Sequence, residues 1–254
     1  MVYPWYEVEH AGSHPSRGYA MIFDLRTDDL HPGKVPEYAA AVRDLALPAV
    51  QRHGIRLAGW YYTEIGTLNR VVHIWAFRDG EHLATARAQL RQDLSWTGRF
   101  IPRVLPLIAA QQSQLCEAAD FSPAPPPASD PGAAGEPGAS GTPARDALHD
   151  LRTYDLHPGK LGEYRAAVRE LAWPIRERHG VRLAGWYSFE TGTLDRVVHI
   201  WAYRDWAQLT EAKARFRADP DWTQRYLPRA LPLIAAQHSQ IVYASDFSPR
   251  PAPA

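Results

Sequence analysis

Cysteine, lysine and long apolar runs are scarce in this chain of 254 residues. One cysteine excludes an internal disulfide framework and any cysteine-based zinc or iron–sulfur site. Lysine supplies three of the 28 basic residues, which balance 28 acidic residues, so the chain lacks the basic surface of a nucleic-acid-binding protein. No apolar run reaches the ~20 residues that span a bilayer, and residues 1–20 lack the pattern of a signal peptide. We therefore expect a cytoplasmic protein with no nucleic-acid or membrane partner.

Motifs for common cofactors are missing as well. The sequence has no Gly-x-Gly-x-x-Gly, no phosphate-binding loop and no Gly-x-Ser-x-Gly, which disfavours nucleotide cofactors and serine hydrolysis. Apart from His10 and His14 in the N-terminal arm, its histidines have no close i,i+2 or i,i+4 partners for a metal site, although a single axial haem histidine needs no such spacing. We expect no bound metal and no bound cofactor.

An internal repeat organises the sequence. Residues 25–123 match residues 151–249 at a constant offset of 126, with 64 identities in 99 pairs and no gap. A unit of about 100 residues is too long for a solenoid repeat and suits a small domain. The repeat therefore predicts duplication and fusion of one domain, which pairs with its own copy inside one chain. Further homo-oligomerisation stays open.

The composition divides the chain into five parts. We predict an N-terminal arm (1–20), a first domain (21–122), a linker (123–146), a second domain (147–249) and a tail (250–254). Proline, glycine, alanine and serine dominate the linker, which is typical of a flexible coil. A coil of this length spans roughly 27 Å. The two domains can then meet face to face.

The alternation of polar and apolar residues predicts the same elements in both copies. In the first copy these are strands at 21–30, 56–64, 68–77 and 112–120, and helices at 35–53, 80–92 and 96–108. Pro48 and Pro174 fall inside the first helix of each copy and are expected to kink it. Each copy therefore has the β-α-β-β-α-β order of a ferredoxin-like domain, and the fold class is α+β.

Several of the repeated segments lead to a family. LRTYDLHPGK (151–160), RLAGWY (56–61) and RVVHIWA (70–76) together resemble the NIPSNAP family over nearly the whole of both copies. The resemblance implies a dimeric α/β barrel, in which two ferredoxin-like sheets pack together. That barrel group includes cofactor-independent monooxygenases, haem proteins, dehydratases, isomerases and plain ligand binders, so the resemblance leaves the activity open.

The two copies depart from the family pattern at different positions. The family's tyrosine in the first strand is present as Tyr154 but is replaced by Asp28 in the first copy. The family's hairpin asparagine is present as Asn69 but is replaced by Asp195 in the second copy. The two candidate sites therefore need not be equivalent, and we expect a single active site to favour the half that contains Tyr154.

The candidate site follows from the two faces of one strand. His73 and Trp75 alternate with the aliphatic side chains Val72, Ile74 and Ala76. We expect the aliphatic face to pack against helices and the face with His73 to line the space between the two sheets. Neighbouring polar and aromatic residues complete the predicted pocket in the two copies: Asp24, Arg26 and Trp60 in the first, and Asp150, Arg152, Tyr154, Trp186, His199 and Trp201 in the second.

Structural explanations stand beside each of these assignments. Asp24 and Arg26 can form a buried ion pair that fixes the sheet. His73 and His199 can be satisfied core histidines, and the tryptophans can be core packing. If a histidine transfers protons, its imidazole is expected to titrate near neutrality.

Three functional hypotheses remain. The first is a NIPSNAP-like enzyme that acts on an apolar or aromatic metabolite in the barrel pocket, of monooxygenase, isomerase or lyase type. Its acid–base groups would be His199, His73 and Tyr154, with Arg26 or Arg152 holding a substrate oxygen. The second is a protein that binds a small molecule, including haem, without chemistry. The third is a structural or partner-binding pseudo-dimer with a filled core.

Overall fold

The computed structural model describes residues 21–126 and 148–249. The predicted arm, the tail and the linker from residue 127 onward lie outside the described residues. In the first half the elements are β1 (Ile22–Leu30), α1 (Val35–Ala41), η1 (Val42–Ala46), α2 (Leu47–Arg52), β2 (Arg56–Ile65), β3 (Arg70–Phe77), α3 (Gly80–Leu90), η2 (Trp96–Phe100), α4 (Ile101–Val104), η3 (Leu105–Leu107) and β4 (Ile108–Ala118).

The second half repeats this order. Its elements are β5 (Leu148–Leu156), α5 (Leu161–Ala167), η4 (Val168–Ala172), α6 (Trp173–Arg178), β6 (Arg182–Phe189), β7 (Arg196–Tyr203), α7 (Trp206–Ala218), η5 (Asp221–Tyr226), α8 (Leu227–Ala230), η6 (Leu231–Leu233) and β8 (Ile234–Ala244). The predicted β-α-β-β-α-β order is therefore confirmed in both copies. The last strand of each copy begins earlier than predicted, at Ile108 and Ile234.

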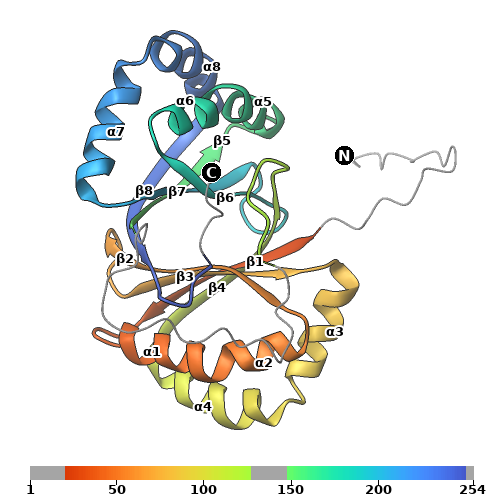
Figure 1. Ribbon diagram of the computed structural model, residues 1–254. Coiled ribbons are helices and arrows are strands. Elements are labelled where there is room, and N and C mark those ends of the chain that lie inside the picture. Colours follow the sequence, from red (N-terminus) through yellow and green to blue (C-terminus); the bar gives the residue numbers. More distant parts are fainter. Residues whose placement is uncertain (1–20, 127–147, 250–254) are drawn as a thin grey trace, which may run out of the picture.

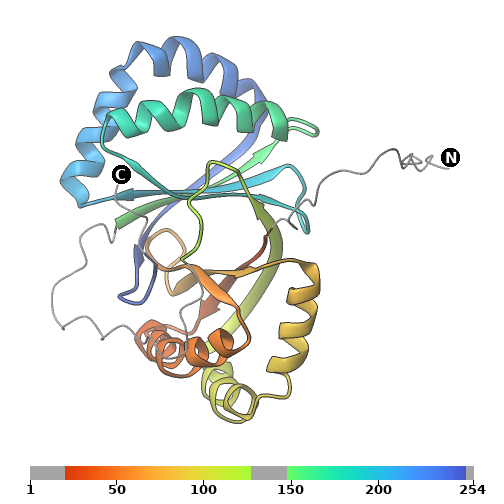
Figure 2. The same ribbon diagram turned by 45° about the vertical axis from the view of Figure 1, so that its right-hand side comes forward.

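The eight strands form one closed antiparallel barrel. Their order around it is β1-β3-β2-β8-β5-β7-β6-β4, and β4 pairs with β1 to close the ring. The halves are joined at two seams, where β2 pairs with β8 and β4 pairs with β6. The helices of each half cover the outside of its own strands, so the barrel lies between two helical layers (Figures 1 and 2). The intramolecular dimeric α/β barrel is confirmed.

Each strand presents one side chain to the lumen and the next to the helices. The lumen is lined by an apolar cluster that draws on both halves and includes Val72, Ile74 and Ala76 together with Val198 and Ile200. Two further clusters, one in each half, lie between the barrel and the helices and contain Trp75 and Trp201, respectively. The expected facing of the hairpin strand is therefore wrong. Its aliphatic side faces the lumen, and its His–Trp side faces the helices.

A short segment after each half's last strand packs on the other half. Ser248 Oγ accepts a hydrogen bond from the backbone N–H of Trp60 at 2.9 Å, and the ring of Phe247 lies 5.2 Å from that indole. Ser122 and Phe121 repeat these contacts on Trp186, at 2.9 Å and 5.6 Å. The halves therefore hold each other reciprocally, in addition to the strand pairing at the seams.

The kink predicted at the prolines takes the form of a π-helical turn. The turn η1 ends directly before α2, whose first turn contains Pro48, and η4 stands in the same relation to α6 and Pro174. Proline has no N–H to donate and is tolerated in the first turn of a helix, so the wider turn before it lets the chain continue. These π-helical turns widen the helices at the cavities described below.

Local backbone geometry explains two of the repeated motifs. A bulge separates Leu57 from Gly59 in the pairing of β2 with β3, and a Cβ atom on Gly59 would lie 2.6 Å from the ring of Tyr61. Only glycine fits at this point of the GWY motif. Asn69 has φ of 58° and accepts a hydrogen bond from the N–H of Gly33, and Asp195 does the same in the second half. The exchange of these two residues therefore preserves the turn.

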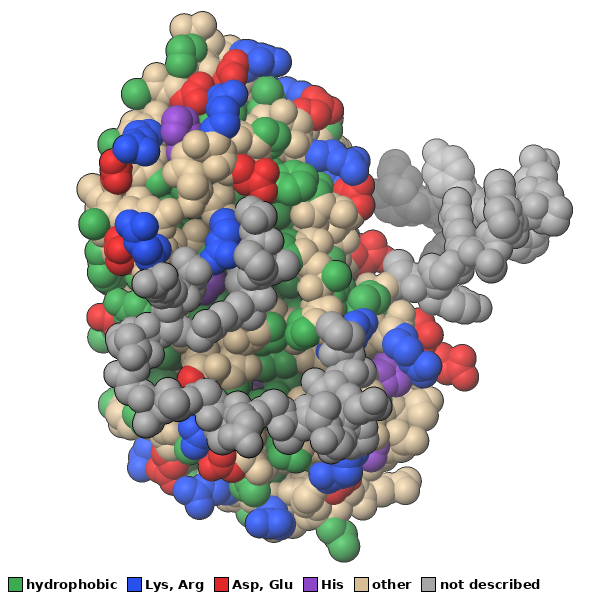
Figure 3. Space-filling model, viewed as in Figure 1, with side chains coloured by type: hydrophobic (Ala, Val, Ile, Leu, Met, Phe, Trp, Pro, Cys, Tyr) green, Lys and Arg blue, Asp and Glu red, His purple; other side chains and the backbone are tan. Residues whose placement is uncertain are grey.

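Surface charge and helix length bear on the expected partners. On the face shown in Figure 3, basic and acidic side chains are interspersed over the helices of both halves. Within residues 21–126 and 148–249, no helix has the length and apolarity needed to cross a bilayer.

The closed barrel predicts that one chain folds without a partner. Circular dichroism and sedimentation equilibrium, followed together over a dilution series into the nanomolar range, should show constant secondary structure because both seams lie within the chain. Unfolding that tracks dissociation of a dimer would contradict this expectation.

Candidate functional site

Each half contains a cavity between its strands and its helices. The cavity of the second half has a volume of about 350 Å³, and that of the first half has about 120 Å³. The two are equivalent by the repeat. We name them the second-half cavity, lined by Arg152, Tyr154, Arg176, His199, Trp201, Lys213 and others, and the first-half cavity, lined by Asp24, Arg26, Asp28, Tyr38, His73, Trp75 and others.

A tryptophan fixes the tautomer of the histidine in each cavity. Trp75 donates its indole N–H to His73 Nδ1 at 2.7 Å, and Trp201 donates to His199 Nδ1 at the same distance. An Nδ1 that accepts a hydrogen bond carries no proton, so the proton of the neutral ring is on Nε2. Residues two apart in a strand point to the same face, so the His-x-Trp spacing itself places the two rings in contact. Each histidine therefore presents an Nε2–H donor.

In the first half this donor is already used. His73 Nε2 lies 2.9 Å from Asp28, whose carboxylate also accepts from Tyr38 Oη at 2.5 Å and Gln111 Nε2 at 3.2 Å. Asp28 is 1% exposed. Burial acts to raise the pKa of its carboxyl, but the hydrogen bonds from His73 and Tyr38 outweigh burial and lower this pKa. The first-half cavity therefore holds an ionised carboxylate that its own donors satisfy.

In the second half the same donor is free to bind a ligand. Tyr154 replaces Asp28, and its hydroxyl hydrogen-bonds to Arg152. The Tyr154 ring lies perpendicular to the imidazole of His199, with ring centroids 4.6 Å apart. Among the described residues, none forms a hydrogen bond with the buried Nε2 of His199. A buried N–H without a partner costs free energy that a ligand oxygen would recover.

The charge state of His199 follows from its surroundings. Burial, together with the positive charges of Arg152 and Arg176, lowers the pKa of His199 well below its ordinary value of 6.5. A shift in this direction does not suit the near-neutral titration expected of a histidine that transfers protons. At neutral pH, His199 is an uncharged hydrogen-bond donor.

The acidic residues of the first strand belong to ion-pair networks. Asp24 accepts from Arg26 at 3.0 Å, Arg87 at 2.8 Å and Ser113 at 2.6 Å. Asp150 is bound in the same way by Arg152 at 3.1 Å, Lys213 at 3.0 Å and Ser239 at 2.6 Å. Burial opposes ionisation of Asp150, but these partners outweigh it and bring its pKa to about 2. The two aspartates hold the neighbouring cations in place at the cavity wall.

The predicted tryptophans divide into two groups. Trp75 and Trp201 line the cavities. Trp60 and Trp186 line neither cavity and are fully buried under Phe247 and Phe121. Their assignment to the pocket wall is corrected, because the neighbouring strand β2 or β6 turns these side chains toward the segment from the other half.

Sequence reasoning missed the most unusual residue of the second-half cavity. Arg176 is 3% exposed, and its guanidinium lies over the rings of Trp201, Phe216 and Trp222 at 4.3, 4.8 and 5.2 Å. Its equivalent in the first half is Val50. A charged residue at an apolar position of an amphipathic helix, in one copy only, was the available signal.

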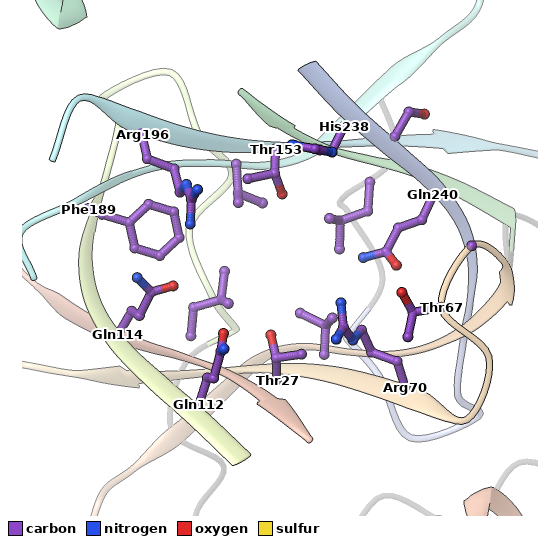
Figure 4. A pocket seen from close by; sticks show the side chains of 16 residues that line it. Thr27, Thr67, Arg70, Gln112, Gln114, Thr153, Phe189, Arg196, His238 and Gln240 are labelled. Atoms are coloured by element: carbon purple, nitrogen blue, oxygen red, sulfur yellow. The ribbon is translucent and has the colours of Figure 1, made fainter. Parts of the chain in front are cut away.

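The lumen holds a third cavity, of about 330 Å³, which both halves line (Figure 4). Thr27, Thr153, Gln112 and His238 point into it. Its two arginines are paired with carboxylates at the barrel rim: Arg70 with Asp29 at 2.6 Å and Arg196 with Asp155 at 2.5 Å. Each arginine of the lumen cavity is therefore neutralised by a carboxylate, which among the described residues is not the case for Arg176 in the second-half cavity.

His73 and His199 do not suit the role of an axial ligand to haem iron. An iron ligand needs an imidazole lone pair, and Nδ1 of each ring accepts from an indole while Nε2 carries the proton. Ligation through Nε2 would require the proton to move to Nδ1 and break the contact with tryptophan. Within the described part of the chain, no three His, Cys, Asp or Glu side chains gather into a metal site.

Comparison with known proteins settles the family. The NIPSNAP family model matches residues 23–123 and again residues 149–249. The chain belongs to the NIPSNAP family. Protein NipSnap homolog 3A of Homo sapiens is 33% identical over 97 residues, which are 38% of this chain and 38% of that protein. Protein NipSnap homolog 3B of Mus musculus is 21% identical over 238 residues, which are 92% of this chain and 88% of that protein.

Solved structures place the fold of this NIPSNAP protein. A NIPSNAP family protein of unknown function from Agrobacterium tumefaciens is 33% identical and covers 44% of this chain and 98% of its own, with a TM-score of 0.39. A monooxygenase-like protein of Lactobacillus acidophilus has a TM-score of 0.62 at 11% identity, over 90% of this chain and 95% of its own. An anthrone oxidase-like protein has a TM-score of 0.53 at 12% identity, over 89% and 91%. The last two share the fold of the NIPSNAP chain.

The lowered pKa of His199 predicts acid sensitivity. Below pH 6.5 the unfolded chain protonates this histidine while the folded chain does not, so the free energy of unfolding falls as the pH falls. The contribution approaches ~1.4 kcal/mol per pH unit. Urea denaturation of the wild type and of His199→Gln at pH 7.0, 6.0 and 5.0 measures it. The stability of the variant should depend less on pH, and parallel pH profiles would contradict the assigned charge state.

Proposed function

We propose that the second-half cavity is the active site of a small-molecule enzyme, and that the Nε2–H of His199 binds a carbonyl or enolate oxygen of the substrate. The observation that carries this proposal is the buried donor itself, which has no partner among the described residues and borders a cavity of about 350 Å³. Aromatic walls at Tyr154, Trp201 and Trp222 suit a flat, aromatic metabolite.

A neutral imidazole suits this role. It donates a hydrogen bond to an oxygen that gains negative charge when a proton leaves the adjacent carbon, and it needs no positive charge of its own to do so. The depressed pKa of His199 keeps its ring uncharged at neutral pH. His199 therefore stabilises the enolate and does not act as the base that its sequence motif suggests.

Tyr154 is the proton-transfer candidate. Asp150 is committed to Arg152, Lys213 and Ser239 and has a pKa of about 2, so it is a poor base. The Tyr154 oxygen accepts a hydrogen bond from Arg152 beside the imidazole, so its phenolate form can take the proton that leaves the substrate carbon and become the neutral hydroxyl. Formation of an enolate is shared by isomerase, lyase and cofactor-independent monooxygenase reactions, so it fits the resemblance to monooxygenase-like and anthrone oxidase-like folds.

The first-half cavity is the inactive counterpart in this proposal. Asp28 occupies the Nε2–H of His73, and the cavity is about one third as large. His73 is therefore assigned a structural role, and the catalytic asymmetry between the halves follows the Tyr154/Asp28 difference.

Anthrone tests this proposal, because its methylene beside an aromatic ketone is readily deprotonated. One O₂ converts it to anthraquinone and water, which an oxygen electrode and ultraviolet absorbance follow together. We expect the wild type to accelerate the reaction and His199→Gln to lower kcat by about 10²-fold, the usual effect of removing an oxyanion donor. His73→Gln, at the same position of the first half, is the matched control and should retain near wild-type kcat.

Two results would count against the active-site assignment. Equal losses in His199→Gln and His73→Gln, with unchanged melting temperatures, would remove the distinction between the halves. Binding of anthrone that weakens in His199→Gln, without any acceleration of its oxidation in the wild type, would favour a non-catalytic binding protein.

A further inference from the structure

The second-half cavity is more positively charged than the first-half cavity. Four charged positions are shared by the halves: Asp24 and Asp150, Arg26 and Arg152, Arg87 and Lys213, and Arg91 and Arg217, of which Arg217 lines its cavity. Two positions differ, because Tyr154 replaces the carboxylate of Asp28 and Arg176 replaces the apolar Val50. Each difference makes the second-half cavity more positive by one charge. The first-half cavity is balanced by its own aspartates, and the second-half cavity is not.

Arg176 is a buried cation that lacks an anion. Its NH1 lies 3.5 Å from the hydroxyl of Tyr203, and its Nε has no hydrogen-bond partner among the described residues. In that part of the chain no carboxylate lies within 4.0 Å of its guanidinium, and aromatic faces surround it instead. Aromatic faces compensate only part of the cost of burying such a charge, which an anionic ligand would offset more fully.

The first half shows what an anion does in this architecture. The carboxylate of Asp28 is held by His73, Tyr38 and Gln111. Of the equivalent residues in the second half, His199 and Gln237 line the cavity, whereas the hydroxyl of Tyr164 lies 3.5 Å from that of Tyr226. The second-half cavity therefore keeps two of the three donors of a carboxylate site, and Tyr154 stands where the internal carboxylate would be.

We propose that the second-half cavity takes an aromatic carboxylate, with Arg176 neutralising the carboxylate, and that Asp28 supplies the corresponding carboxylate internally in the first half. The inference rests on the proposed function, since it defines the substrate class of the same cavity. The guanidinium offers a planar fork of donors that matches a carboxylate, and the rings stacked on it extend as a flat wall for the aromatic part of the ligand. The first-half cavity is then closed to external ligands.

Isothermal titration with 2-naphthoate and its neutral analogue 2-naphthamide tests the charge preference. We expect 2-naphthoate to bind the wild-type chain at least tenfold more tightly than the amide. Arg176→Met keeps an unbranched apolar side chain against the rings and should reduce this preference to below threefold. Arg215→Gln is the control, because it removes one exposed positive charge from the outside of α7 and should leave the preference unchanged.

A second variant tests the role assigned to Asp28. Tyr154→Asp places a carboxylate beside His199, whereas Tyr154→Asn removes the same ring and adds no charge, so Tyr154→Asp should bind 2-naphthoate at least tenfold more weakly than Tyr154→Asn. Thermal melts of both variants check that the fold is kept.

The outcomes separate the two proposals. Equal affinities for acid and amide, or a preference for the acid that persists in Arg176→Met, would overturn the anion inference and leave the cavity as a binding site for neutral aromatic compounds. Equal losses in Tyr154→Asp and Tyr154→Asn would overturn the idea of an internal carboxylate. Failure of both probes to bind would overturn the proposed function together with this inference.

Discussion

Closing eight strands within one chain leaves each side chain of a strand only two places, the lumen or the layer under the helices. The seams between β2 and β8 and between β4 and β6 make this division strict, since no sheet edge remains where a strand could shift. Aliphatic residues from both halves line the lumen. The alternate residues, which carry the histidines and the cavity-lining tryptophans, are thereby placed under the helices. Two separate cavities, one in each half, are the direct consequence.

Duplication inside one chain frees the two cavities to diverge. In a dimer of identical chains, a change at one site appears at both sites. Here the first half has Asp28 and Val50, and the second has Tyr154 and Arg176 at the equivalent positions. The scaffold itself is held constant, since the His–Trp contact is 2.7 Å in both halves and the serine contact on the tryptophan backbone is 2.9 Å in both. The two cavities thus have the same surrounding contacts and chemically different linings.

Local sequence patterns were sufficient for the elements, and the family resemblance supplied the closure of the barrel. Strand alternation, helix spacing and the repeat depend on neighbours along the chain, so they are legible without a structure. The orientation of β3 could not be predicted in this way. Both of its faces are apolar enough to be buried, and only the contacts between the halves decide which face lines the lumen. The wrong facing placed the site between the sheets. It also hid the role of α6, whose Arg176 lies under the helices together with His199.

The candidate site residues could be predicted from the sequence only in part. His73, His199 and Tyr154 stood out through the motif and the Asp28 difference, and the structure brings them to the cavities. The charge balance of the cavities could not be predicted from the sequence, because the partners of Asp24 come from α3 and β4 and those of Asp150 from α7 and β8. The same holds for the depressed pKa of His199, which depends on burial and on two arginines from other parts of the second half.

We propose that one half supplies its own anion and that the other must bind one. A crystal structure of the protein grown with 2-naphthoate tests this most directly. We expect electron density for one naphthoate in the second-half cavity, with a carboxylate oxygen within hydrogen-bond distance of Arg176, and Asp28 unchanged in the first half. Naphthoate bound in the first-half cavity or the lumen, with the second-half cavity empty, would contradict it.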